Sequence, residues 1–281
     1  MELAGKVALV TGASRGVGAA TAIALAEAGC DVACAARATR DAPMKTPGTL
    51  DETLEGIEAF GRRGLAVPTD LALEDDVVRM VERTVEAFGR LDVLINNAAI
   101  TFVGDLDIPM KRHDLIMEVN LRAPLIAIRT AVPHLVADGG GAIINVSSAA
   151  ALSPFPGLMS YGVSKIGLER MTVDVANQLY AKGVAANCFR IDIPVASEGF
   201  VANTPGVDRT DWEPSEVAAE GMVWVLRQPL EFSGHLLSMA ELREKYGIMK
   251  SRAQQPTRTV SPRSIVTGIV ADRGETMFED A

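Results

Sequence analysis

The chain has 281 residues, 48% of them hydrophobic, with a net charge of -9 and three cysteines. That length favours one α/β domain with a sizeable core, and the acidic balance argues against nucleic acid or an anionic membrane as a partner, because both attract basic surfaces. An odd number of cysteines without a C-x-x-C motif favours reduced thiols in a cytoplasmic protein, and no segment has the pattern of a signal peptide or a membrane span.

Short apolar runs alternate along the chain with segments of helical periodicity. Strands are predicted at residues 7–10, 32–35, 65–67, 93–95, 143–146, 185–189 and 235–238, and helices near 19–28, 50–62, 74–88, 111–137, 161–181 and 214–227. Repeated alternation of this kind predicts an α/β fold, a doubly wound parallel sheet of about seven strands with helices on both faces. Ligands of such a sheet bind at the carboxyl ends of its strands.

A glycine-rich turn, residues 11–18, lies between the first predicted strand and the first predicted helix. Its glycines allow a phosphate to approach the backbone, and the helix start offers free N–H groups and a positive dipole end. The order strand, glycine turn, helix predicts a dinucleotide site. Residues 1–240 are therefore predicted to form one Rossmann-type domain.

Two residues of the predicted helix 161–181 are candidates for acid–base catalysis. Tyr161 and Lys165 are four apart and share one helix face. An ammonium beside a phenol favours the phenolate and lowers the pKa of the tyrosine, which makes it a usable proton donor and acceptor. The ordinary alternative is an amphipathic helix on which these two polar residues have no catalytic role.

Polar side chains also follow two of the predicted strands. Ser147 and Ser148 end the strand 143–146, and Asn96-Asn97-Ala98-Ala99 ends the strand 93–95. Both groups lie at the ligand-binding edge of the predicted sheet. The simpler alternative is that they satisfy loop backbone, as asparagine and serine often do.

Over roughly residues 1–190, this set of motifs resembles the short-chain dehydrogenase/reductase family. The resemblance implies a catalytic tetrad of Asn120, Ser148, Tyr161 and Lys165. It also implies a coenzyme site, with Ala99 where the family usually has glycine. The expected coenzyme-binding residues are Gly12, Ser14, Arg15, Gly16, Val17, Gly18, Arg37, Asp70, Leu71, Asn97, Ala98, Ala99, Tyr161, Lys165 and Ser197.

The family mechanism assigns each member of the tetrad a role. Ser148 would polarise a substrate carbonyl, and Tyr161 would give or take the proton. Lys165 would hold the nicotinamide ribose and lower the pKa of Tyr161, and Asn120 would hold a water linking Lys165 to solvent. The hydride chemistry belongs to the coenzyme, and the expected substrate is a small carbonyl compound or alcohol.

Part of the sequence is similar to one branch of the family, and the resemblance to the family ends at about residue 190. Residues 46–49 and 109–112 are most similar to the hydroxysteroid dehydrogenase-like branch. After residue 190 the chain departs from the family, because Ile191-Asp192 replaces the usual Pro-Gly and Ser197 takes the place of the usual threonine. A substrate lid is expected at about 195–211. The polar residues 241–281 predict a loosely ordered extension or an arm onto a neighbouring subunit.

The residues after the second strand favour NADP(H) as the coenzyme, with NAD(H) as the alternative. Ala36 stands where an NAD enzyme of this fold carries an acid for the adenosine ribose, and Arg37 follows it. Arg37 offers a planar charged fork for a 2′-phosphate, which Arg15 can approach from the glycine turn. The simpler alternative is a pair of solvated arginines.

Two other functions compete with an oxidoreductase. Residues 12–16 fit the G-x-S-x-G elbow of hydrolases, but the elbow would have to follow the first strand, and only His113, His134 and His235 are available. These histidines also lack metal-ligand spacing, so no metal is expected. A catalytically impaired dinucleotide-binding scaffold or regulatory protein is the second alternative, supported only by residues 190–197.

The resemblance further implies a homo-oligomer, a homotetramer or a homodimer built by pairing of the long helices. These helices carry more apolar residues than packing against one face of the sheet requires, among them Leu125, Ile126, Ile128 and Met171.

Overall fold

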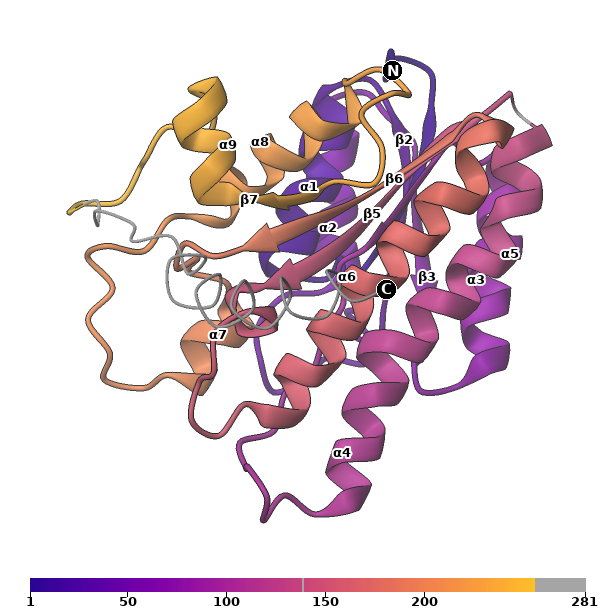
Figure 1. Cartoon of the computed structure of the whole chain (residues 1–281). Helices are drawn as coiled ribbons and strands as arrows, with labels where there is room; N and C mark the ends of the chain where they lie inside the picture. Colours follow the sequence, from indigo (N-terminus) through magenta and orange to yellow (C-terminus); the bar gives the residue numbers. More distant parts are fainter. Residues whose placement is uncertain (138, 256–281) are drawn as a thin grey trace, which may run out of the picture.

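The computed structural model describes residues 1–137 and 139–255, and its centre is a seven-stranded parallel sheet with the order β3-β2-β1-β4-β5-β6-β7 (Figure 1). The strands are β1 Val7–Thr11, β2 Asp31–Ala36, β3 Gly64–Pro68, β4 Val93–Asn96, β5 Gly141–Ser148, β6 Val184–Ile191 and β7 Leu236–Ser238. Every predicted strand is present, and the doubly wound α/β fold is confirmed. The direction of winding reverses between β1 and β4, which is where such sheets bind nucleotides.

Helices cover both faces of the sheet. One face carries α1 Gly16–Glu27, α2 Leu50–Glu58 and α8 Ser215–Leu226, and the other carries α3 Glu74–Phe88, α5 Ala123–Ala137 and α6 Met159–Leu179. Figure 1 shows α3, α5 and α6 together on the right of the sheet. The arrowheads of β5 and β6 point toward α7 Glu198–Asn203, a short helix that was not predicted.

The predicted helix 111–137 is divided into three parts. They are α4 Met110–Met117, a π-helical turn at Glu118–Arg122 and then α5. A π-helical turn widens the backbone locally and is frequent at functional sites. Asn120 lies inside this turn.

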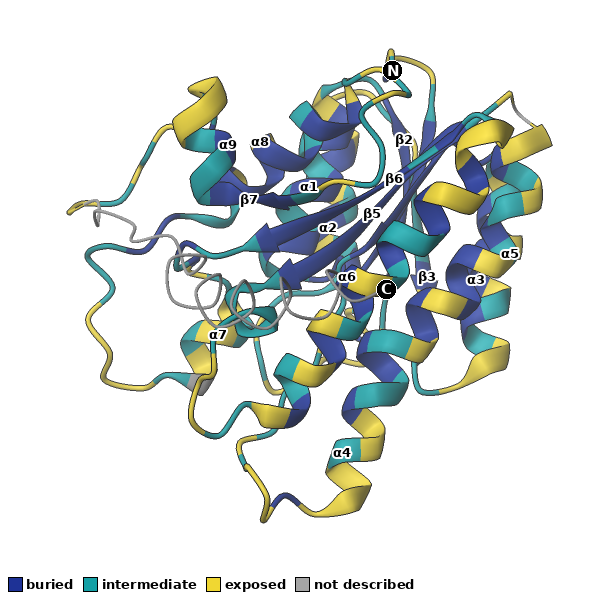
Figure 2. Cartoon of the chain, in the orientation of Figure 1, coloured by how far each residue is buried: buried dark blue, intermediate teal, exposed yellow. Residues whose placement is uncertain are grey.

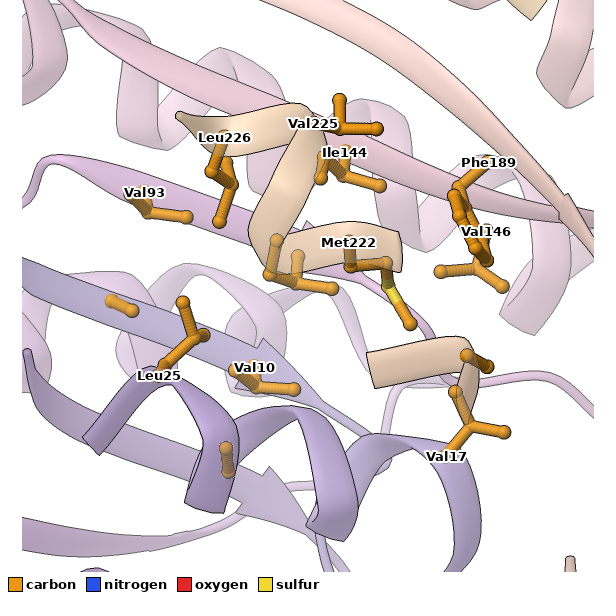
Figure 3. Close-up of a cluster of buried hydrophobic side chains, with 14 of the residues drawn as sticks. Val10, Val17, Leu25, Val93, Ile144, Val146, Phe189, Met222, Val225 and Leu226 are labelled. Carbon is orange, nitrogen blue, oxygen red and sulfur yellow. The ribbon is translucent and has the colours of Figure 1, made fainter. Parts of the chain in front are cut away.

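The inner strands are buried on both faces, as the dark blue ribbon of β5 and β6 in Figure 2 illustrates, whereas the edge strand β3 is only partly buried. All five residues of β1 are buried, which explains why they form a continuous apolar run instead of an alternating one. Figure 3 shows Val10 and Ile144 of the sheet in one buried cluster with Leu25 of α1 and Met222 of α8. The core thereby fixes α1, whose first residues follow the glycine turn.

The predicted C-terminal extension contains ordered structure. Helix α9 Met239–Tyr246 begins at β7, with Leu242 1% exposed. Met249 has no exposed surface, and the N–H of Gln255 donates to the carbonyl of Thr210 at 2.8 Å. Residues 241–255 therefore contact this chain's own core through Leu242 and Met249, where a loosely ordered extension or an arm onto a neighbouring subunit had been expected. Residues 256–281 lie outside the described residues.

Within residues 1–137 and 139–255, no helix is both long enough and apolar enough to span a membrane.

Candidate active site

The glycine turn is shaped by close approach of backbone to backbone. A β-carbon on Gly18 would lie 2.3 Å from the carbonyl oxygen of Gly12 and 2.5 Å from Nδ2 of Asn97. Gly12 and Gly16 have φ angles of 67° and 56°, which L-residues with side chains rarely adopt. The turn therefore depends on glycine at all three positions.

The N-terminus of α1 is open to an anion. The N-cap Arg15 makes no capping hydrogen bond, and the first turn of α1 has no acidic residue. By contrast, Thr49 and Glu52 form a complete capping box on α2. The free N–H groups and the positive dipole end of α1 fit the pyrophosphate of a dinucleotide.

Two arginines lie beside this turn. A guanidinium N–H of Arg15 donates to the carbonyl of Gly48 at 3.0 Å, and its Nε is buried without a hydrogen-bond partner. Burial lowers the pKa of Arg15, the carboxylate of Glu198 raises it and the positive charge of Arg37 lowers it. Arg37 itself is exposed just beyond β2. The pair provides positive charge beside the turn, near the end of β2.

The remaining predicted coenzyme residues lie along the same edge of the sheet. Asn97 donates its side-chain amide to the carbonyl of Thr11 at 2.8 Å, so this amide shapes the turn. The Thr11 hydroxyl accepts from the N–H groups of Asn97 and Ala98, a contact that sequence reasoning missed. Ser14 and Val17 are buried, and Ala99 is exposed. Leu71 is partly buried against the core, and Asp70 accepts from the N–H of Ala72.

The segment expected to form the substrate lid, about 195–211, reaches the glycine turn from the other half of the sheet. A β-carbon on Gly16 would lie 2.9 Å from Cβ of Ser197 and 3.3 Å from Oε2 of Glu198. Ser197 caps α7 by accepting from the N–H of Phe200. Ser197 is therefore beside the turn, as the resemblance implies, but it brings an acidic neighbour with it.

Both polar atoms of the Asn120 side chain form hydrogen bonds within the chain. Its Oδ1 accepts from the N–H of Ile100 at 2.8 Å, and its Nδ2 donates to the carbonyl of Ile100 and to Oγ of Ser164. The side chain has no exposed surface. It therefore ties the π-helical turn to α6 and to the segment after β4.

Ser148, Tyr161 and Lys165 come together where β5 ends and α6 begins. The Ser148 side chain lies close enough to the Tyr161 hydroxyl to affect its pKa, and Nζ of Lys165 is 5.6 Å from the centre of the Tyr161 ring. Lys165 donates to the carbonyl of Val146 at 2.7 Å. The structure thus assembles the three residues that the sequence selected.

The protonation of this group differs from the expectation. Burial raises the pKa of Tyr161 above its ordinary value, and the Ser148 side chain lowers it by less than burial raises it. The expected lowering by Lys165 is not seen, because its ammonium is turned toward the Val146 carbonyl. Burial lowers the pKa of Lys165 to about 8.

Sequence reasoning missed a buried ionic cluster behind Lys165. Glu169 of α6 pairs with Arg190 of β6, and Ser147 of β5 donates to the same carboxylate. The available signal was the spacing of Glu169, four residues after Lys165, which places both on one helix face.

The histidines do not support a hydrolase. Nδ1 of His113 lies 3.0 Å from Oγ of Ser160, and the ring of His235 stacks on Phe232. Across the described part of the chain, no three His, Cys, Asp or Glu side chains form a group that could hold a metal ion.

Comparison with known proteins identifies the family. The model of the short chain dehydrogenase family matches residues 6–193. Hydroxysteroid dehydrogenase-like protein 2 of Danio rerio and of Xenopus tropicalis are 31% and 32% identical over 252 residues, or 88% of this chain. The chain spans 60% of the length of these two relatives. The predicted likeness to this branch is confirmed.

Solved structures agree with this assignment. A Xanthomonas campestris protein described as a dehydrogenase is 32% identical, with a TM-score of 0.81 over 92% of this chain and 97% of its own. A short chain dehydrogenase from Burkholderia cenocepacia, crystallised with NADP, is 31% identical, with a TM-score of 0.74 over 85% of this chain and 97% of its own. The chain belongs to the short-chain dehydrogenase/reductase family.

Proposed function

We propose that this chain is an NADP(H)-dependent oxidoreductase that interconverts a carbonyl compound and a secondary alcohol. The observation that carries the proposal is the meeting of Ser148, Tyr161 and Lys165 at the carboxyl edge of the sheet, beside an uncapped glycine turn. The coenzyme supplies the hydride.

The chain's own residues supply position and proton transfer. The Ser148 hydroxyl donates to the substrate oxygen and polarises the carbonyl. The Tyr161 hydroxyl gives its proton to that oxygen in reduction and takes it back in oxidation. The Lys165 ammonium holds the ribose hydroxyls and, on turning from the Val146 carbonyl, favours the Tyr161 phenolate. Asn120 keeps the π-helical turn and α6 together.

Replacement of Tyr161 tests this mechanism. Tyr161→Phe removes the proton donor, and we expect turnover to fall roughly a hundredfold or more, with coenzyme binding retained. Tyr180→Phe is the matched control, because Tyr180 is 45% exposed beyond the end of α6. Normal turnover in Tyr161→Phe would end the mechanism. A wild-type chain that binds coenzyme but converts no member of a broad ketone and alcohol panel would support the impaired scaffold instead.

The preference for NADP(H) rests on charge. The positive charge of Arg37 lies close enough to Arg15 to lower the pKa of Arg15, and Ala36 leaves no carboxylate at the end of β2 to repel a 2′-phosphate. Arg37→Asp should weaken NADPH binding by about 2 kcal/mol and affect NADH far less. Arg83→Asp on α3 makes the same charge change elsewhere and should affect neither. Wild-type binding of NADH as tight as NADPH would refute the preference.

The proposed assembly is a homotetramer, or failing that a homodimer, in the cytoplasm. Ile126 and Ile128 are buried within the chain, so two of the four residues that suggested an interface are core residues. Leu125 is 42% exposed on α5, and Val163 and Ile166 are 47% and 43% exposed on α6. Paired helices of two copies would cover them. Light scattering that gives a monomer at micromolar concentration would reject the assembly.

A further inference from the structure

A buried ion pair lies between helix α6 and the sheet. Nε and a terminal nitrogen of Arg190 contact the two carboxylate oxygens of Glu169 at 2.8 and 2.7 Å, and Oγ of Ser147 donates to Oε1 at 2.8 Å. The side chains of Arg190 and Glu169 are 3% and 1% exposed. Ser147 and Arg190 are register partners on β5 and β6, so both face α6. We call these three residues the Glu169 cluster.

The cluster continues a polar stripe along α6. Lys165, Glu169 and Thr172 lie at spacings of four and three and therefore share one helix face. Each contacts the end of β5: Lys165 donates to the Val146 carbonyl, and Asn145 donates to Thr172 at 2.9 Å. Polar contacts at successive positions of β5 set how far α6 lies along the strand and how it is rotated.

Burying an ion pair costs desolvation free energy, so stability alone does not explain this arrangement. A buried ion pair can often be replaced by packed apolar residues without loss of stability. The core on this side of the sheet is otherwise apolar and includes Leu168, Val175 and Leu179 of the same helix. A role at the neighbouring active site explains why three polar groups are held together here.

Glu169 is the carboxylate that acts electrostatically on Lys165, from one helical turn further along α6. On α6 the groups around Lys165 are Tyr161 and Glu169, and on β6 they are the buried thiol of Cys188 and, beyond it, Arg190. Ser147 and Ser148 of β5 and Asn120 of the π-helical turn are neutral, and the charged residues of that turn, Glu118 and Arg122, pair with each other in partly exposed positions. Burial lowers the pKa of Lys165, and Cys188 and then Glu169 raise it by smaller amounts; of these two, Glu169 is the carboxylate.

We propose that the Glu169 cluster is a positioning device for Lys165: Arg190 and Ser147 hold the Glu169 carboxylate one helical turn behind the ammonium, which fixes the place and the charge of Lys165. Glu169, Arg190 and Ser147 are thus positioning residues. The inference rests on the proposed role of Lys165 in coenzyme binding and proton transfer.

Titration of Lys165 in the protein without coenzyme tests the proposal directly. Lysine labelled with ¹³C at Cε reports its protonation by NMR, and Lys165→Met assigns the signal. In Glu169→Gln the pKa of Lys165 should fall by about one unit or more, because the neighbouring carboxylate is lost and the Arg190 charge is left unbalanced. Asp174→Asn is the matched control: Asp174 lies on the same helix in an exposed pair with Arg170, and its loss should leave the signal unchanged.

A double variant separates positioning from folding. Glu169→Gln with Arg190→Met removes both charges, which buried pairs tolerate better than loss of one partner. The pKa of Lys165 should still fall, and the high-pH limbs of coenzyme affinity and of kcat/KM should move to lower pH with it. An unchanged Lys165 titration in a folded double variant would make the cluster structural and overturn the proposal.

The same experiment separates this inference from the proposed function. If the wild-type chain lacks activity but the Lys165 signal moves as expected, the positioning stands and the oxidoreductase assignment fails. If Tyr161→Phe abolishes turnover but the Lys165 signal does not move in the double variant, the function stands and the positioning fails.

Discussion

The glycine turn and the lid meet at Gly16, but they are held in different ways. The turn is built from close backbone approaches within residues 11–18, completed by Asn97 and Ala98. The segments that flank the expected lid are held by carboxylates that bind residues 30 to 48 positions away. The first depends on the absence of side chains, whereas the second depends on charged side chains finding distant partners.

Two acidic residues hold the second region. Asp192, which stands in the family's usual glycine position, accepts from the Ser238 hydroxyl and from the N–H of Ala240. Glu213 binds Arg243 at 2.8 Å and accepts from the N–H of Arg252 at 2.8 Å. Asp192, at the departure from Pro-Gly, therefore joins the segment before the expected lid to the start of α9, and Glu213 joins the segment after it to α9 and to residue 252.

The largest effect is expected at Gly18, where the backbone atoms of the glycine turn approach one another most closely. Gly18→Ala places a methyl group 2.3 Å from a backbone oxygen that cannot move away without opening the turn. Coenzyme binding should weaken by roughly a hundredfold or more. Fluorescence titration with reduced coenzyme measures it, and circular dichroism reports whether the fold survives. Gly199→Ala is the control, because its β-carbon meets nothing within 4 Å. Equal binding by the Gly18 and Gly199 variants would contradict this account of the turn.

This contrast also explains how far the sequence could predict the molecule. The sheet and the turn follow from local patterns: apolar runs for β1 to β6, and glycines whose φ angles admit little else. Ser148, Tyr161 and Lys165 came from the resemblance and are assembled as expected. The Arg190–Glu169 pair joins residues 21 apart and the Glu213–Arg243 pair joins residues 30 apart. Neither spacing matches the period of a helix or of a strand, so no sequence motif predicts these pairs.

The second prediction concerns the carboxylate that ties the segment after the expected lid to the C-terminal segment. The Glu213 side chain is 1% exposed, and Arg243 is 23% exposed. Glu213→Gln should lower the free energy of unfolding by about 2 kcal/mol, because a charged hydrogen-bond network is lost. Amide exchange in residues 247–255 should rise more than in the strands. Glu244→Gln on α9 removes an exposed carboxylate nearby and should change neither quantity. Unchanged exchange in the Glu213 variant would show that the segment is held by apolar packing alone.

The stabilisation by Glu213 should depend on pH. Its hydrogen bonds and the charge of Arg243 outweigh burial and hold the pKa of Glu213 below its ordinary 4.5. The contribution is therefore complete above pH 4.5 and is lost as the pH falls through the folded-state pKa. Unfolding free energies of wild type and Glu213→Gln should converge in that acidic range. A difference that stays constant down to pH 3 would assign the effect to shape instead of charge.

The smallest effect is expected where the two regions touch. The Glu198 carboxylate lies against Gly16 and raises the pKa of Arg15, so its negative charge faces the place that the pyrophosphate would occupy. Coenzyme binding must then overcome repulsion between like charges, or move Glu198 aside together with α7. Glu198→Gln should tighten coenzyme binding by roughly threefold at low salt, since the group is exposed and screened. Because the Debye length is about 10 Å at 0.1 M ionic strength and about 3 Å at 1 M, the gain should shrink as salt is raised. Glu244→Gln again provides the control for a change in net charge. Weaker binding in Glu198→Gln would mean that the carboxylate helps to hold Arg15 for the coenzyme, and the lid would then support the glycine turn instead of opposing its ligand.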